Sequence, residues 1–186
     1  MTLEYGPDGK LRCGWALSAP EYLDYHDHEW GRPVSTVSGL YERLSLEAFQ
    51  SGLSWITILR KRESFRAAFA GFQPELVAGF GPADVDRLMN DPGIVRNRAK
   101  IEATIANAKV VARLGGDFAR LILGYAVPGR PRPTGTVPAS SPESAALAAA
   151  LRSAGIRFVG PTTAYALMQA VGLVDDHLEG CFVPRL

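Results

Sequence analysis

The sequence predicts an all-α fold in one domain. Apolar residues recur at intervals of three and four over most of the chain, which is the pattern of helices with one buried face. We find no sustained alternation of apolar and polar residues, no stretch typical of a β-hairpin and no internal repeat. The 186 residues are 47% hydrophobic, which suits one globular domain over 1–186 with a sizeable core.

The first helix is expected after a short N-terminal arm. Residues 1–12 show no helical periodicity, and we expect them to be flexible. Pro20 is suited to a helix start, where its missing N–H needs no partner, and Gly31-Arg32-Pro33 ends that helix. Ser35 or Thr36 can cap the next helix.

Two longer helices are predicted next, separated near Gly52 and with the second beginning at Ser54. Their expected inward residues are Leu40, Tyr41, Leu44 and Ala48, then Ile56, Leu59 and Phe65.

The second half of the chain predicts further helices, whose boundaries are set by proline and glycine. The expected elements are short helices over 74–80 and 82–89, a longer helix from Asn97 to Gly115-Gly116, a proline-rich surface loop over 127–142, a helix opened by Ser141-Pro142-Glu143 and closed by Gly155, and a helix after Pro161.

The charge gives little indication of a partner. The formal net charge is +1, so only local basic clusters could indicate nucleic acid. A solvated helix face is the commoner explanation of such clusters. The two clusters are Arg60, Lys61, Arg62 and Arg66, and Arg96, Arg98 and Lys100.

No segment indicates a membrane or secretion. Residues 1–12 contain no apolar core of a signal peptide, and no run approaches the roughly 18 apolar residues of a membrane span. We therefore expect a cytoplasmic protein with reduced thiols and no membrane partner.

A tight turn precedes the last predicted helix. Phe158 and Val159 are followed by Gly160-Pro161-Thr162-Thr163. A glycine turn that leads into a helix presents free N–H groups and a positive dipole end, which suits a phosphate group. An ordinary helix N-terminus is the commoner use of such a turn.

Cysteine and histidine residues near both ends could form a metal site. Cys13 and His26 lie near the N-terminus, and His177 and Cys181 near the C-terminus. Two thiolates and two imidazoles complete a tetrahedral zinc set. From spacing alone, zinc competes evenly with a disulfide or two buried free thiols. His28 is expected to be a surface side chain.

Five stretches together resemble the 3-methyladenine DNA glycosylase I family, which belongs to the helix-hairpin-helix DNA glycosylase superfamily. The stretches are L-R-C-G-W, Y-H-D-H-E-W-G, L-E-A-F-Q-S-G-L-S-W-I-T-I-L-R-K-R-E, V-G-P-T-T-A and G-L-V-D-D-H. The resemblance implies a helix-hairpin-helix glycosylase fold with a zinc site joining the N- and C-terminal segments. It also implies a monomeric, monofunctional enzyme that flips N3-alkylated adenine out of double-stranded DNA and hydrolyses its N-glycosidic bond.

The resemblance assigns roles to the matching residues. Glu47 is the expected catalytic carboxylate, which accepts hydrogen bonds from the base, and Trp55 stacks on that base. The other implied roles are base contact for Tyr25 and Trp30, with Trp15 in the wall; a wedge into the duplex for Gly52 and Leu53; DNA backbone contact for Val159, Gly160, Thr162 and Thr163; and ligation of a structural Zn²⁺ for Cys13, His26, His177 and Cys181.

The chemistry of the implied substrate suits these residue types. An extruded base is stacked on aromatic faces and read at its edge. Alkylation makes the purine cationic, so each aromatic ring can add about 0.5–2 kcal/mol by cation–π attraction. Without the resemblance, each aromatic would more often be core, and Glu47 a solvated helix residue. Hydrolysis should pass through an oxocarbenium-like state, with water attacking.

Two further expectations concern the role of the zinc and the role of Asp175. Four protein ligands leave zinc no open position, so Cys13→Ser should unfold the terminal region without changing the chemistry. Asp175 stands where the superfamily has its catalytic aspartate, although the family resembled here typically has asparagine there. We favour a role for Asp175 in capping the last helix and orienting His177.

Two rival functions remain open from the sequence. A non-enzymatic, zinc-stabilised DNA-binding module would need the turn and the metal, but no acidic residue among tryptophans. Release of free base from alkylated DNA separates this module from an enzyme. The second rival is a glycosylase with another substrate, such as a neutral damaged base, which competition by free 3-methyladenine, set against 7-methylguanine, would discriminate.

Overall fold

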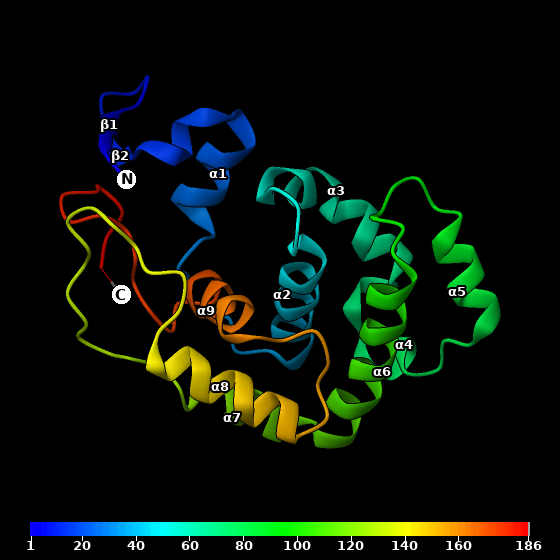
Figure 1. The fold of residues 1–186 in the computed structure, drawn as a ribbon. Helices are drawn as coiled ribbons and strands as arrows, with labels where there is room; N and C mark the ends of the chain where they lie inside the picture. The colour runs from blue at the N-terminus through cyan, green and yellow to red at the C-terminus, as the bar shows by residue number, and fades with distance from the viewer. Residues whose placement is uncertain (186) are drawn as a thin grey trace.

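The computed structural model describes residues 1–185, and nearly all of its regular structure is helical (Figure 1). The predicted all-α class is therefore confirmed in its main part. The exception is a two-stranded sheet at the N-terminus. None of the helices within residues 1–185 is long and apolar enough to cross a lipid bilayer.

The N-terminal segment is a β-hairpin followed by two short helices. Leu3 pairs with Cys13 and Tyr5 with Leu11 in antiparallel register. The expectation of a flexible arm over 1–12 is wrong as to secondary structure, because the turn Pro7-Asp8-Gly9 closes a hairpin, with Gly9 at φ +75°. The elements are β1 (Leu3–Tyr5), β2 (Leu11–Cys13), the 3-10 helix η1 (Gly14–Ser18) and α1 (Pro20–His28).

A buried arginine holds this hairpin in place. Arg12 is only 2% exposed, and its guanidinium donates hydrogen bonds to Asp8 and Asp27. The same guanidinium lies 4.5 Å from the ring centroid of Phe182, close to the C-terminus. The hairpin is therefore tied both to α1 and to the other end of the chain.

Two helices form the centre of the fold, α2 (Val37–Gln50) and α3 (Trp55–Ala68). Thr36 caps α2, as predicted, by accepting a hydrogen bond from Gly39 N. In α3 the fully buried residues are Ile58 and Phe65, whereas the predicted Ile56 and Leu59 are only partly buried.

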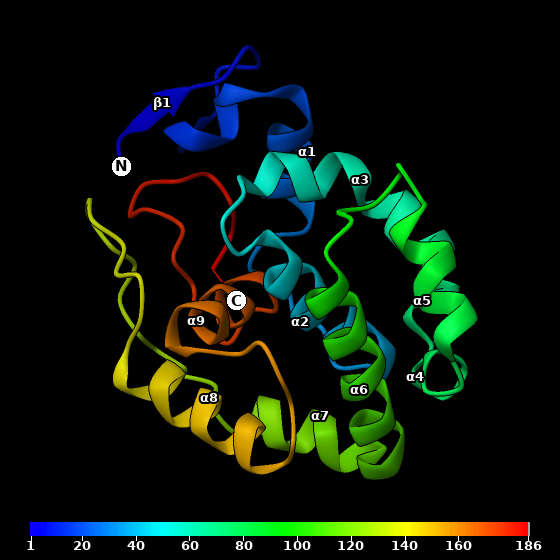
Figure 2. The same ribbon diagram turned by 45° about the vertical axis from the view of Figure 1, so that its right-hand side comes forward.

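The middle of the chain packs against α2 from one side, and the last helix packs against it from the other (Figure 2). Asn97 caps α6, as its sequence position predicted. A helix begins directly at Gly116, where the sequence predicted only a stop. The elements are η2 (Ala70–Phe72), α4 (Pro74–Val77), α5 (Pro82–Met89), α6 (Arg98–Leu114) and α7 (Gly116–Leu123).

The predicted loop over 127–142 has no regular structure before α8, but it is anchored to the C-terminal segment. Val127 N donates to Leu173 O, and Glu179 N donates to Pro133 O. Arg132 is 7% exposed and lies deep within this contact. The chain then forms α8 (Pro142–Ser153) and α9 (Pro161–Ala170), which pack against each other.

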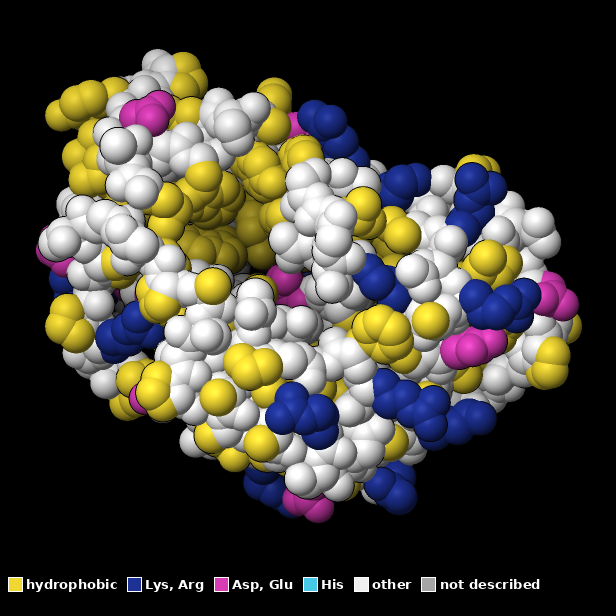
Figure 3. Space-filling model, in the orientation of Figure 1, with side chains coloured by type: hydrophobic (Ala, Val, Ile, Leu, Met, Phe, Trp, Pro, Cys, Tyr) yellow, Lys and Arg dark blue, Asp and Glu magenta, His cyan; other side chains and the backbone are white. Residues whose placement is uncertain are grey.

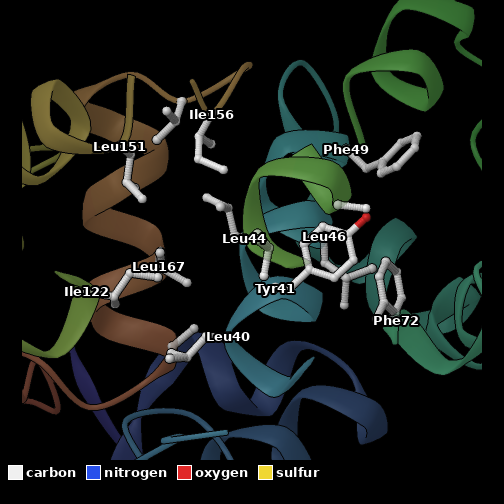
Figure 4. Close-up of a cluster of buried hydrophobic side chains, with 14 of the residues drawn as sticks. Leu40, Tyr41, Leu44, Leu46, Phe49, Phe72, Ile122, Leu151, Ile156 and Leu167 are labelled. Carbon is white, nitrogen blue, oxygen red and sulfur yellow. The ribbon is translucent and has the colours of Figure 1, made fainter. Parts of the chain in front are cut away.

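The larger of two hydrophobic clusters joins the helices from α2 to α9, with α2 at its centre (Figure 4). Leu40 and Leu44 point toward Leu167 of α9, while Tyr41 lies on the side of Phe72. The Tyr41 hydroxyl donates to Thr104 O in α6, so the buried phenol is satisfied. This packing fixes α2 relative to α9, and both helices contribute side chains to the site described next.

Candidate active site

A hollow lined by aromatic rings opens on the face shown in Figure 3. Its volume is about 290 Å³. We call it the aromatic pocket. It is lined by Trp15, Tyr22, Tyr25, Trp30, Glu47, Gln50, Trp55, Ala166 and Gln169.

The rings come from the N-terminal segment and from the first turn of α3. Trp15 lies edge-on to both Trp30 and Tyr22, with centroid distances of 5.2 and 5.5 Å. Tyr25 and Trp55 form a second pair at 5.5 Å. Pairs at such distances are stabilising in themselves, so the pocket walls are preorganised.

Among residues 1–185, Glu47 is the only acidic residue lining the aromatic pocket. It lies on α2 and is 6% exposed. Burial raises the pKa of its carboxyl to about 8, and the charge of nearby Arg43 opposes that shift. Burial, and then the neighbouring Glu47, raise the pKa of Tyr25, so this phenol keeps its proton.

A second cleft of about 320 Å³ adjoins the aromatic pocket and shares Glu47, Gln50 and Ala166 with it. One wall is the turn Ser51–Gly52–Leu53, and the other is Thr162 and Thr163 at the start of α9. Leu53 is 42% exposed. Gly52 and Leu53 of the predicted wedge therefore line the same cleft as Thr162 and Thr163 of the predicted backbone contact, whereas Val159 and Gly160 are not among its lining residues.

The turn after α2 is held by a buried lysine. Lys100 Nζ donates to Phe49 O at 2.9 Å and to Ser51 O at 2.6 Å. These are carbonyls at the end of α2, which a helix leaves without partners. Lys100 had been predicted only as part of a basic cluster.

The start of α9 offers free backbone donors, as the turn motif predicted. Gly160 is the N-cap residue and no side chain caps the helix. A side chain added at Gly160 would meet no atom within 4 Å, so this backbone is open to an approaching group. The dipole of α9 adds positive potential there.

Three of the four predicted metal ligands form one buried group. The ligand atoms of Cys13, His26 and Cys181 all lie within 4.8 Å of one another. Cys181 Sγ is 3.5 Å from His26 Nε2. The hydrogen bond with Cys13, and then the contact with His26, lower the pKa of the Cys181 thiol, which favours the thiolate. Both cysteines are free, so the alternative of a disulfide is not formed.

His177 lies beside this group, and its ring centroid is 5.0 Å from that of His26. Its Nδ1 is held by Asp175 Oδ1 at 2.9 Å, while its buried Nε2 has no partner. His26 Nδ1 is held in the same way by Asp27 Oδ1 at 2.8 Å. A carboxylate on one ring nitrogen, with the other nitrogen facing inward, is the usual support of a histidine metal ligand.

The cysteine–histidine group and the aromatic pocket share a wall. The Trp15 ring lies 5.3 Å from that of His26, and the Trp30 ring lies 4.7 Å from that of His177. Any contact that fixes the rings of His26 and His177 therefore also helps to position Trp15 and Trp30 in the pocket wall.

Asp175 contacts His177, but its expected capping of the last helix is wrong, because α9 ends at Ala170 with Val171 as its C-cap. Asp175 Oδ2 accepts from Arg132 Nε at 2.7 Å, and its Oδ1 accepts from His177 N as well as contacting His177 Nδ1. It does not line the aromatic pocket. Its oxygens are thus engaged in orienting His177. His28 is exposed, as predicted, and pairs with Asp24.

Sequence reasoning missed Tyr22, Gln50 and Gln169 in the aromatic pocket. Tyr22 precedes Tyr25 by three residues, so helical spacing could have placed it on the same face. Gln50 follows Glu47 by the same interval. Gln169 gives no such signal, because only the packing of α9 against α2 brings it to the pocket.

The comparisons with known proteins agree on one family. A profile of the methyladenine glycosylase family matches residues 15–184. DNA-3-methyladenine glycosylase 1 of Escherichia coli (strain K12) is 44% identical over 178 residues, covering 91% of this chain and 95% of that protein.

Two solved structures are similar over almost their full length. A crystal structure of 3-methyladenine DNA glycosylase I has a TM-score of 0.85 and 44% identity, covering 92% of this chain and 98% of that one. The 3-methyladenine DNA glycosylase I of Staphylococcus aureus, described with the structural basis of its 3-methyladenine recognition, has a TM-score of 0.84 and 35% identity, covering 94% and 97%.

Proposed function

This chain belongs to the methyladenine glycosylase family, and from that premise and the pocket geometry we infer that it is a DNA-3-methyladenine glycosylase. It hydrolyses the N-glycosidic bond of 3-methyladenine in DNA and leaves an abasic site. The observation that carries this function is the position of Glu47, the single acidic side chain in a pocket otherwise walled mainly by aromatic rings.

The pocket suits a cationic purine. Rings of Trp15, Trp30, Tyr25 and Trp55 offer electron-rich surfaces, and each cation–π contact adds about 0.5–2 kcal/mol. The Glu47 carboxylate adds charge pairing and accepts hydrogen bonds from the amino edge of the base. Neutral adenine can still donate from its amino group but gains neither the cation–π attraction nor the charge pairing, so the pocket discriminates by charge.

The chain's own groups have a limited part in bond cleavage. A cationic base is a good leaving group, and water attacks an oxocarbenium-like sugar. In the part of the chain that the structure describes, no lysine lines the pocket, so no amine lies where it could form a covalent sugar intermediate. Lys100 is engaged with two carbonyls. Release of the base without strand cleavage follows.

We propose that α8, the following turn and α9 form the helix-hairpin-helix element, with Val159, Gly160, Thr162 and Thr163 at the DNA backbone. The uncapped start of α9 supports phosphate contact. Gly52 and the exposed Leu53, which line the same cleft as Thr162 and Thr163, would fill the gap left by an extruded nucleotide in this proposal.

We propose a structural Zn²⁺ held by Cys13, His26, His177 and Cys181. Its support is the donor set, the carboxylate on each histidine Nδ1, and the buried His177 Nε2 that lacks a partner. When bound, the ion would join the two ends of the chain and leave no ligand position for substrate. Metal analysis of the purified protein tests this proposal, and purified protein without bound zinc contradicts it.

We further propose a monomer acting on double-stranded DNA in the cytoplasm. Reduced thiols are needed at Cys13 and Cys181 for metal binding, and the cytoplasm keeps thiols reduced. Light scattering of the free protein tests the oligomeric state.

The function is tested by base release from methylated DNA. Wild-type protein should release 3-methyladenine, and Glu47→Gln should release it much more slowly. Comparable release by both proteins would remove the role of Glu47. Binding of alkylated DNA without base release would instead favour a non-enzymatic DNA-binding module.

A further inference from the structure

Most cationic side chains of this protein are neutralised within the fold. In the first basic cluster of the sequence, Arg60 pairs with Glu21 and Arg62 pairs with Glu29. Arg66 pairs with Glu42 and Glu63. A phosphate would have to displace these carboxylates before it could pair with the arginines. This cluster is therefore poorly suited to binding DNA.

Three exposed cations are different. Within residues 1–185, the side chains of Arg96, Lys109 and Arg157 have no hydrogen-bond or ion-pair partner. Two more, Arg113 and Arg152, donate only to main-chain carbonyls. These last two contacts reach Ala154 and Val159, so uncompensated charge gathers where α6, α8 and the turn before α9 meet.

Lys109 and Arg157 line a separate groove of about 660 Å³ between α5 and α6. We call it the α5–α6 groove. Its other charged residues, Arg98 and Glu102, pair with each other at 3.6 Å. The charges that remain in the groove are therefore the two cations. Its remaining lining residues are Phe80, Gly81, Pro82, Val85, Ile105 and Ala106.

The groove is linked to the proposed phosphate contact at Val159 to Thr163 through the turn that carries Arg157. Asn107 of α6 accepts a hydrogen bond from Arg157 N at 2.7 Å and donates one to Arg157 O at 3.1 Å. The next residue, Phe158, is 47% exposed and has φ +56°, a conformation that is strained for a bulky side chain. Two partly buried hydrogen bonds thus fix the backbone that carries Arg157. Local strain of the kind seen at Phe158 is often found at functional sites.

Basic side chains also gather beyond the hollow on the face in Figure 3. We propose that the α5–α6 groove binds the sugar-phosphate backbone of the DNA flanking the lesion, through Lys109 and Arg157, as an extension of the contact at the start of α9. This proposal rests on the proposed function, because it takes the same DNA duplex as the partner. The contact is with phosphates and carries no base readout.

Salt dependence of DNA binding tests the groove directly. Each neutralised phosphate contributes about −0.9 to the slope of log K against log salt concentration. With a duplex that carries one central abasic-site analogue, Lys109→Gln and Arg157→Gln should each make the slope shallower by about 0.9, and the double variant by about 1.8.

The matched control is Arg120→Gln, because Arg120 is also exposed but pairs with Asp117 on α7. Arg120→Gln should keep the wild-type slope. Lys109→Arg should keep it as well, because it preserves the positive charge. Tryptophan fluorescence on binding free 3-methyladenine checks the fold, since neither groove cation lines the aromatic pocket. Wild-type slopes in both glutamine variants would overturn the proposal. Failure of the proposed function would show separately, as absence of base release by the wild-type protein.

Discussion

The ionisation of Glu47 depends on what occupies the aromatic pocket. Burial raises the pKa of its carboxyl to about 8, and only the charge of Arg43 opposes this shift. A positive base entering the pocket would supply the missing counter-charge and favour the ionised form. Binding of a cationic base is therefore expected to lower the pKa of Glu47, and ionisation of Glu47 is expected to strengthen binding of that base.

This linkage predicts a pH dependence of base release. In the wild-type protein, kcat/KM should rise with pH through about 8, because it reports the ionisation of the free enzyme. Glu47→Gln should lose this rise and be roughly 10- to 100-fold slower at high pH, the range expected for a lost hydrogen bond to a charged group. Parallel pH profiles of the two proteins would show that Glu47 does not recognise the charge.

The same shift predicts an effect on stability with the opposite pH trend. A carboxyl whose pKa is raised on folding destabilises the folded state increasingly as pH rises from 4.5 through about 8. Glu47→Gln should therefore match the wild-type free energy of unfolding near pH 4.5 and exceed it above pH 8. Urea denaturation at both pH values measures this difference. Glu63→Gln, at a side chain 80% exposed, is the control and should show no such change.

Sequence alone could not distinguish Glu47 from Glu42 as the functional acid. Both lie on the buried side of α2. Glu42 is neutralised by its neighbour Arg43 on α2 and by Arg66, which the packing of α3 brings to it. The family resemblance identifies Glu47 as the functional acid. The fold shows how it differs physically from Glu42, because among the described residues Glu47 forms no such ion pair.

At the scale of elements, the turn after α2 depends on α6. Lys100→Met keeps the bulk of the side chain but removes the donors to Phe49 O and Ser51 O. We expect base release from duplex DNA to fall about tenfold, because two hydrogen bonds from a charged donor hold the turn that carries Leu53. Release from methylated single-stranded DNA should fall less, because no gap in a duplex has to be filled.

Lys61→Met is the matched control for this prediction. Lys61 Nζ also donates to two carbonyls, Pro92 O and Gly93 O, but lies away from the cleft. An equal loss on duplex and single-stranded DNA in Lys100→Met would show a general loss of fold rather than a misplaced turn.

The start of α9 allows an equally local test. Gly160 has φ −114° and ψ 176°, which any residue adopts, and an added Cβ would meet no atom within 4 Å. Gly160→Ala should therefore unfold within about 0.5 kcal/mol of wild type. Its methyl group would stand beside the uncapped N–H groups, so DNA affinity should fall about tenfold in a titration.

Gly135→Ala provides the control, because an added Cβ there also meets no atom within 4 Å. It lies in the loop before α8 and should leave DNA affinity unchanged. Wild-type affinity in Gly160→Ala would contradict backbone contact at this turn.

Elements with local start signals could be predicted from the sequence, and those held by distant contacts could not. Thr36, Asn97 and Ser141 each cap a helix by bonding an N–H three residues later, so the signal lies within one turn. The β-hairpin has strands of only three residues, too short to show alternation. Its turn Pro7-Asp8-Gly9 was visible, but its anchor at Asp27 was not.

At the scale of the whole molecule, the two ends of the chain meet beside the aromatic pocket. Leu178 N donates to Cys13 Sγ, and Phe182 N donates to Leu11 O. The sequence could suggest a Cys–His set but not its neighbours, because only the fold places Trp15 and Trp30 against its histidines. The earlier expectation that Cys13→Ser leaves the chemistry unchanged therefore needs revision.

Loss of the proposed zinc should weaken recognition of the base as well as the join between the chain ends. Without the ion, His26 and His177 lose the restraint that positions Trp15 and Trp30 in the pocket wall. Chelator-treated protein and Cys13→Ser should both unfold at lower temperature and bind free 3-methyladenine about tenfold more weakly, as measured by tryptophan fluorescence. Added Zn²⁺ should restore the chelated wild type, and His28→Ala, at a histidine 74% exposed, should behave as wild type throughout. Unchanged base affinity after verified metal loss would show that aromatic packing alone holds the pocket wall.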